Sequence, residues 1–338
     1  MNEEVRIVID TIGGDNGTSV MVKGAIEGLK KYDNLKIIFT GHESEIKKIL
    51  DSYDCDMSRV EIINTTEEIS LNESPVKAVR EKKDSSLVVG MMKLKNNEAD
   101  AFVSAGSSGA VLAGGQFIVG RAKGVKRTPL APLIPTSHNP SLLIDCGANV
   151  DAKPEVLVQF AEMGTIYMKS VCNVKNPTVA IVNIGVEEEK GNALVKAAYP
   201  LLKADKKINF IGSIESREIP FGKADVILTE AFVGNVILKL YEGLAKMIIG
   251  EIKGAMFSSF KSKLGALLIK GSLKSTVSKF NASDKGGAPL LGLKGLVVKI
   301  HGNSKENEVI SAIQQCMTFI KEDVSGKIIR GFEDDNVE

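Results

Sequence analysis

The sequence predicts an α/β protein, specifically a doubly wound three-layer α/β/α sandwich with a mainly parallel sheet. Two observations support this prediction. Short apolar runs alternate with helix-length amphipathic segments along most of the chain, and such alternation builds a parallel sheet with helices on both faces. Proline also stands at two expected helix starts, Ser74-Pro75 and Lys153-Pro154, where its fixed φ suits the first helical position.

The expected strands follow one another in chain order, with helices between most of them. The first run, Val5–Asp10, leads into a helix that ends near Lys31, and further helices are expected after Pro75 and Ser86. The remaining expected strands are Leu35–Thr40, Val60–Ile63, Asp100–Ser104, Leu142–Asp145, Thr178–Asn183, Ile208–Ile211, Val226–Leu228 and Leu296–Ile300. We expect all of these strands in one body.

Residues 252–283 interrupt the alternation. This stretch contains six lysines and no Asp or Glu. Its apolar residues recur at helical spacing, which predicts one apolar face flanked by lysines. The residues of that face are Met256, Phe260, Leu264, Leu267 and Leu268. We therefore expect a catalytic body formed by residues 1–251 and 284–338, with a lysine-rich amphipathic helical extension at 252–283 inserted before the last strand.

The composition is that of a globular protein. The 338 residues are 43% hydrophobic and 25% charged, and the net charge of +1 gives no general attraction to nucleic acid or to anionic membranes. Four well-separated cysteines favour reduced thiols in a cytoplasm. The acidic amino terminus lacks a signal-peptide pattern, and no run of about 18 apolar residues is present to span a bilayer. We expect a cytoplasmic protein that binds no nucleic acid.

Loops that follow the carboxyl ends of parallel strands are the expected ligand site. The glycines of the loop Asp10–Gly17 allow backbone N–H groups to approach an anion. The loop Ser104–Gly109 offers three hydroxyls and two glycines, and is the stronger phosphate candidate. Helix capping by Asp15 or Asn16, and by Ser107 or Ser108, is the structural alternative. The candidate phosphate-binding residues are Asp15, Asn16, Ser104, Gly106, Ser107, Ser108 and Gly109.

Three other strand exits supply candidate catalytic groups. Lys190 follows three glutamates and is expected to bind phosphate as a point charge. Glu230 is expected to hold or deprotonate phosphate, and Asn235 either donates to an oxyanion or caps the next helix. His301, at the exit of the last strand, is the remaining catalytic candidate. None of the three histidines has a neighbour at metal-ligand spacing, so no metal is expected.

Together these segments resemble the phosphate acyltransferases of bacterial glycerolipid synthesis, which convert acyl-(acyl carrier protein) and phosphate to acyl phosphate. The resemblance runs nearly end to end and depends on the order and spacing of the motifs. They are Asp10–Asn16, Ser74–Arg80, Val103–Ala110, Ile144–Glu155, Glu188–Asn192, Ala231–Val236, Lys285–Gly295 and Lys299–Ser304. The sequence departs from the usual family letters at Ser107-Ser108, Glu189 and Glu230-Ala231, among other positions, which leaves individual roles open.

The resemblance implies a fold like that of phosphate acetyltransferase and the isocitrate dehydrogenase group, a homodimer, and no metal or organic cofactor. It also implies phosphate and acyl carrier protein as partners, peripheral association with the membrane, and a downstream membrane glycerol-3-phosphate acyltransferase. The extension suits a lipid interface or an acidic carrier protein, with packing on a dimer partner as the alternative. The expected contact residues are Lys261, Lys263, Leu264, Leu267 and Leu268.

Direct displacement is the expected mechanism, because phosphate is itself a nucleophile and needs only to be bound and aimed at the thioester carbonyl. Three rival functions are a short-chain acyl-coenzyme A phosphotransacylase, a metal- and NAD-dependent decarboxylating dehydrogenase, and an inactive membrane scaffold with the same fold. The lysine-rich extension disfavours the first, and the lack of clustered aspartates and arginines disfavours the second.

Overall fold

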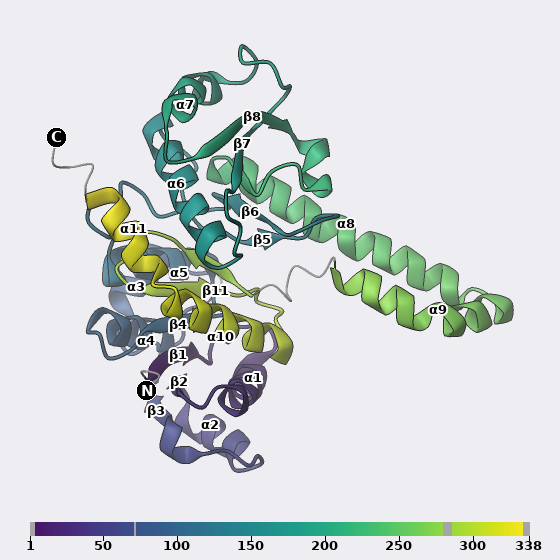
Figure 1. The fold of residues 1–338 in the computed structure, drawn as a ribbon. Helices are drawn as coiled ribbons and strands as arrows, with labels where there is room; N and C mark the ends of the chain where they lie inside the picture. Colours follow the sequence, from purple (N-terminus) through teal and green to yellow (C-terminus); the bar gives the residue numbers. More distant parts are fainter. Residues whose placement is uncertain (1–3, 71, 280–285, 334–338) are drawn as a thin grey trace.

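The strands form two sheets rather than the one that the sequence predicts. The computed structural model describes residues 4–70, 72–279 and 286–333 (Figure 1). The first sheet has the order β10-β11-β4-β1-β2-β3 and the second the order β5-β6-β9-β7-β8. The first contains β1 (Val5–Asp10), β2 (Leu35–Gly41), β3 (Val60–Asn64), β4 (Ala101–Ser104), β10 (Ala288–Leu290) and β11 (Leu296–Lys299). The second contains β5 (Leu133–Ile134), β6 (Ser141–Ile144), β7 (Thr178–Asn183), β8 (Asn209–Glu215) and β9 (Val226–Leu228).

Each sheet is parallel except at one edge. Strand β10 pairs antiparallel with β11, and β5 pairs antiparallel with β6. These two edge strands are absent from the expected set, whereas every apolar run expected to be a strand is one, within a few residues. The mainly parallel α/β architecture is therefore confirmed.

A short segment between the sheets joins them. Leu130 forms an isolated antiparallel bridge with Leu290 of β10. On the other side, the Leu130 carbonyl accepts a hydrogen bond from Cys146 N–H, just beyond β6, at 3.0 Å. The backbone thus connects the edge of the first sheet to the second sheet.

Helices cover both faces of the sheets. They are α1 (Gly17–Lys31), α2 (Glu43–Leu50), α3 (Pro75–Glu81), α4 (Ser86–Lys95), α5 (Ser108–Gly114), α6 (Pro154–Ser170), α7 (Ala193–Ala204), α8 (Ala231–Phe257), α9 (Phe260–Lys279), α10 (Glu306–Lys321) and α11 (Val324–Glu333). Three short segments add to these: the 3-10 helices Met57–Arg59 and Ser216–Phe221, and the π-helical segment Gly115–Val119. Helices α3 and α6 begin at Pro75 and Pro154 as predicted, although the Ser74 side chain forms no capping hydrogen bond.

The alternation of side chains along β1 shows how the core is divided. Ile7 and Ile9 point into a large cluster with α1 and α10, and this cluster continues into β6 and α6 of the second sheet. Val8 points to the opposite face, where α4 covers it. A third cluster packs Ile237 of α8 against the other face of the second sheet. One core therefore spans both sheets and fixes their relative position.

Helices α8 and α9 form a hairpin that projects from the body (Figure 1). Two features of the predicted extension are wrong. Its boundary at residue 252 falls inside α8, which begins at Ala231. The apolar face predicted across Met256 and Leu268 is interrupted, because α8 ends at Phe257 and α9 begins at Phe260. Residues 280–283 of the extension, and Lys285 of one motif, lie outside the described residues.

The contact residues predicted on the extension are exposed in the hairpin. Leu264, Leu267 and Leu268 of α9 are 55%, 68% and 82% exposed, and Lys261 and Lys263 are exposed beside them. In the part of the chain that the structure describes, no helix has the length and apolar character needed to cross a bilayer. The three leucines lie on the exposed surface of the hairpin.

Gly234 fixes where α8 leaves the second sheet. A Cβ at this position would lie 1.8 Å from the Asp145 carbonyl oxygen, immediately after β6. The first turn of α8 therefore packs directly on backbone, and only glycine fits there.

We predict that Gly234→Ala lowers the free energy of unfolding by about 2 kcal/mol or more, because the added methyl overpacks a backbone contact. Thermal unfolding measures the change. Gly243→Ala is the matched control, since a Cβ at Gly243 of the same helix meets nothing within 4 Å. The control should be neutral or more stable by up to ~1 kcal/mol. Equal melting temperatures for the two variants would contradict the packing argument.

Candidate active site

Three loops meet at the carboxyl edge of the first sheet. Strands β1, β4 and β11 are adjacent and parallel, with Asp10 beside Ser104 and Ser104 beside Lys299. The loop after β1 contacts the other two: the Asp15 N–H donates to the Gly302 carbonyl at 2.7 Å. A Cβ at Gly13, whose φ is +106°, would lie 2.8 Å from the Gly106 Cα. Glycine therefore allows the two predicted phosphate loops to touch.

A buried carboxylate supports the Ser104–Gly109 loop. Asp10 accepts hydrogen bonds from the Ser86 and Ser104 hydroxyls, both at 2.6 Å, and from Ile12 N–H at 3.1 Å. Burial raises the pKa of Asp10 to about 6, although these hydrogen bonds oppose the shift. Ser104 in turn accepts from Gly106 N–H at 3.0 Å. Because its one hydroxyl proton is donated to Asp10, Ser104 shapes the loop and has no proton left for a ligand.

Ser107 and Ser108 present hydroxyls without a hydrogen-bond partner among the described residues. Ser107 occupies the N-cap position of α5, yet its side chain makes no capping hydrogen bond, and Ser108 is exposed. The capping alternative for these two serines is therefore wrong. With Gly106 and Gly109 beside them, they are the part of the loop that remains able to bind an anion.

The side chain of Asn16, in the loop after β1, does not cap α1 as the structural alternative proposes. Its amide instead donates to Asn303 Oδ1 at 3.1 Å and to the Ser304 carbonyl at 2.8 Å, so it connects this loop to the one after β11. Asp15 is exposed, with its carboxylate near Gly302. Both residues lie where the sequence predicts, at the edge that carries the Ser104–Gly109 loop.

Lys299 is the main residue that sequence reasoning missed. It ends β11, is only 9% exposed, and donates to the carbonyl of Ala105 at 3.3 Å and to that of Ile300. Burial lowers its pKa to about 8, with Lys239 acting in the same direction and Asp10, Asp15 and Glu242 opposing. One signal was present in the sequence: this lysine directly follows the apolar run Leu296–Val298.

His301 connects the site to α8. Its Nδ1 accepts from Asn303 N–H at 3.0 Å, so Nε2 carries the proton in the neutral ring. Nε2 lies 4.0 Å from Glu242 Oε2, and Glu242 also pairs with Lys239 at 2.8 Å. Burial lowers the pKa of His301. The fourth turn of α8, which carries Glu242, therefore lies beside the loop after β11.

The other three predicted catalytic residues come from the second sheet. The Glu230 carboxylate caps α8, accepting from Phe232 N–H at 2.6 Å and Val233 N–H at 2.9 Å. Asn235 lies inside α8 and caps nothing, so its capping alternative is wrong. It is one and two turns before Lys239 and Glu242, on the helical stripe that faces His301. Lys190, in the loop after β7, is half-exposed and pairs with Glu187 at 2.9 Å.

The structure thus brings most of the predicted residues to one place. Asp15, Asn16, the Ser104–Gly109 loop and His301 share one edge, and Asn235 lies two helical turns before Glu242, the α8 residue beside His301. Lys190 and Glu230 stand at the corresponding edge of the second sheet, and among the described residues the Lys190 side chain pairs with Glu187 and the Glu230 side chain with the first-turn N–H groups of α8. Their predicted roles remain predictions.

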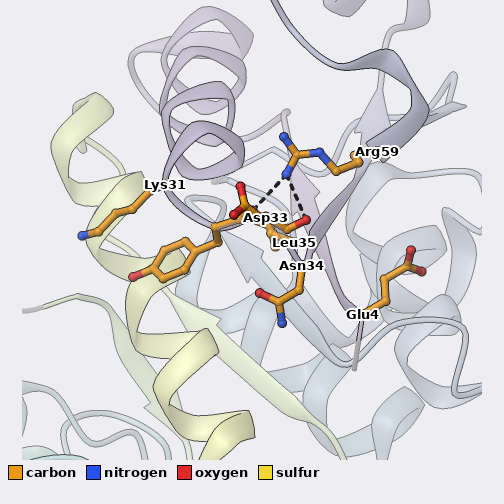
Figure 2. A pocket seen from close by; sticks show the side chains of 7 residues that line it. Glu4, Lys31, Asp33, Asn34, Leu35 and Arg59 are labelled. Carbon is orange, nitrogen blue, oxygen red and sulfur yellow. Dashed lines mark hydrogen bonds between the residues drawn. The ribbon is translucent and has the colours of Figure 1, made fainter. Parts of the chain in front are cut away.

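A separate cavity of about 510 Å³ lies at the opposite edge of the first sheet (Figure 2). Its walls include Asn34 and Leu35, at the start of β2, and Arg59. The Arg59 guanidinium donates to the carbonyls of Tyr32 and Asp33 at 2.9 and 3.4 Å (Figure 2). Since ligands of open parallel sheets bind at the carboxyl edge, this cavity is distinct from the candidate active site.

Comparison with known proteins gives consistent similarities. Residues 5–327 match the family model described as "Fatty acid synthesis protein". The chain is 45% identical over 324 residues to a phosphate acyltransferase of Clostridium novyi, covering 96% of this chain and 97% of that protein. It is 46% identical over 333 residues to a phosphate acyltransferase of Clostridium botulinum, covering 98% and 100%.

Solved structures of similar fold have much lower identity. A phosphotransacetylase from Streptococcus pyogenes matches with a TM-score of 0.62 at 18% identity, covering 95% of each chain. The EutD phosphotransacetylase from Staphylococcus aureus matches with a TM-score of 0.59 at 20% identity, covering 93% of this chain and 94% of that one. At this identity the likeness concerns the fold.

We predict that the Asp10 carboxyl makes folding less favourable as pH rises from about 4 to about 6. Its folded pKa of about 6 exceeds the ordinary 3.8, so the folded state holds the proton longer and loses relative stability as the unfolded state ionises. Two pKa units correspond to about 3 kcal/mol. Denaturant unfolding of the wild type and of Asp10→Asn is measured across this pH range. The difference between their free energies of unfolding gives the contribution of the Asp10 carboxyl, and a difference that does not change with pH would refute the prediction.

Proposed function

This chain belongs to the family of phosphate acyltransferases, and we propose that it transfers a long-chain fatty acyl group from acyl carrier protein to inorganic phosphate. The observation that carries this proposal is the pair of Ser107 and Ser108 hydroxyls, which have no hydrogen-bond partner among the described residues, in a loop whose start is held by the Ser104–Asp10 hydrogen bond. Hydroxyls and backbone N–H groups at a strand exit are suited to a phosphate dianion.

In the proposed reaction, bound phosphate attacks the thioester directly. One phosphate oxygen forms a bond to the carbonyl carbon, the tetrahedral oxyanion collapses, and the C–S bond breaks to release the carrier thiolate, which then takes a proton. The Ser104–Gly109 loop holds the phosphate, and Lys190 adds a cationic ligand. In this proposal, Asn235 or His301 donates to the oxyanion or the leaving sulfur. Glu230, which caps α8, acts by fixing the start of that helix.

The exposed lysines and leucines of the hairpin favour acyl carrier protein, a large acidic protein, over a short-chain thioester as the acyl donor. Lys261 and Lys263 of α9 are exposed and offer positive charge to an acidic carrier protein. The neighbouring leucines are exposed enough to enter a lipid interface. We propose peripheral contact of this hairpin with the membrane. A homodimer and transfer of the product to a membrane glycerol-3-phosphate acyltransferase remain predictions from the family.

The proposal is tested by the double variant Ser107→Ala/Ser108→Ala. Hydrogen bonds to a charged group contribute about 1.5–3 kcal/mol, so the KM for phosphate should rise tenfold or more. The assay follows phosphate-dependent loss of thioester from a long-chain acyl carrier protein, with the acyl phosphate trapped by hydroxylamine.

Two comparisons accompany that assay. Ser325→Ala, in α11 away from the carboxyl edge, should leave the KM unchanged. Acetyl-coenzyme A is offered as an alternative donor. Faster turnover with it than with the long-chain acyl carrier protein would contradict the proposed donor and favour a short-chain phosphotransacylase. Absence of turnover with every thioester would favour an inactive scaffold.

The membrane contact is tested with the double variant Leu267→Glu/Leu268→Glu. Burying a leucine side chain contributes about 1.5–3 kcal/mol, so the affinity for anionic phospholipid vesicles should fall at least tenfold while turnover of soluble acyl carrier protein continues. Leu201→Glu is the matched control, because Leu201 of α7 is also exposed, at 42%. Equal vesicle sedimentation of wild type and double variant would exclude this surface.

A further inference from the structure

We propose that Lys299 is a phosphate-binding residue, whose ammonium group donates a hydrogen bond to the anion held by the Ser104–Gly109 loop. This inference rests on the proposed function and adds a ligand that is not among the candidate site residues predicted from the sequence. It is carried by the position of Lys299, by the hydrogen bonds of its ammonium group and by the charges that surround it.

The position of Lys299 directs it to the loop. It is paired in register with Ser104 on the adjacent parallel strand. The strand residues before it, Val297 and Val298, are completely buried, and the lysine itself is 9% exposed. Its Nζ reaches the Ala105 carbonyl at 3.3 Å, within the backbone of the phosphate loop itself.

The ammonium group has one donor left over. A lysine ammonium carries three N–H groups. Two of them are accounted for by the carbonyls of Ala105 and Ile300. The third has no acceptor among the described residues, at the edge where Ser107 and Ser108 also have free hydroxyls. An anion bound between them would complete all three sets of hydrogen bonds.

The buried charge also lacks a direct counter-ion. Groups on every neighbouring element act on Lys299: Asp10 of β1, Asp15 of the next loop, and Lys239 and Glu242 of α8. His301 follows in its own loop. No carboxylate of the described residues lies within ion-pair distance of Nζ. Burying an ammonium without a direct partner is costly, and a phosphate dianion would offset that cost.

Three substitutions separate charge from hydrogen bonding. Lys299→Met removes both, Lys299→Gln keeps donors for the two carbonyls without the charge, and Lys299→Arg keeps a permanent charge. Lys294→Met, just before the amino end of the same strand, is the control. Inorganic phosphate is titrated into each protein by calorimetry, its KM is measured with acyl carrier protein as donor, and thermal unfolding checks folding.

The expected result is at least a tenfold loss of phosphate affinity for Met and Gln, and near wild-type affinity for Arg and the control. Wild-type affinity should also fall as pH rises through about 8, where Lys299 loses its proton, whereas the Arg variant should not show this fall. Retained affinity in the Gln variant would overturn the proposal, since the lysine would then only position the loop. Absence of turnover by the wild type would instead refute the proposed function, while calorimetry would still decide the role of Lys299.

Discussion

The candidate site depends on the buried carboxylate of Asp10. Its two oxygens accept hydrogen bonds from the hydroxyls of Ser86, at the start of α4, and of Ser104, at the end of β4. These bonds orient Ser104 so that its oxygen accepts the Gly106 N–H. The conformation of the Ser104–Gly109 loop is therefore determined by buried hydrogen bonds within the protein. Such preorganisation reduces the conformational entropy that is lost when a ligand binds.

The sequence predicts the parallel strands and the positions of the glycine- and serine-rich loops after them well, because both depend on local patterns. An apolar run followed by glycine and serine is visible in the letters of Val103–Gly109. The division into two sheets is not visible, because the pattern of a buried strand carries no information about its partner. Strands β5 and β10 are two and three residues long, the latter with a proline at its centre, so neither shows a period.

The misses within the site also have physical causes. Lys299 is one of 43 basic residues, and its importance comes from burial, which appears only when β11 is placed beside β4. Asn235 is the expected cap of α8, but Glu230 occupies the N-cap position and Asn235 lies inside the helix. The apolar spacing from Met256 to Leu268 continues through the turn between α8 and α9, where helical periodicity no longer places residues on one face.

Helix α8 runs uninterrupted from its cap at Glu230, past Glu242 beside His301, to the base of the hairpin turn at Phe257. Each helical residue advances by about 1.5 Å and rotates by about 100°. Loss of one residue between Glu242 and Phe257 would therefore turn the outer hairpin by about 100° relative to the site, whereas loss of seven would turn it by only about 20° and shorten it by about 10 Å. The hairpin can thus change length in steps of seven residues and keep the same surface directed outward.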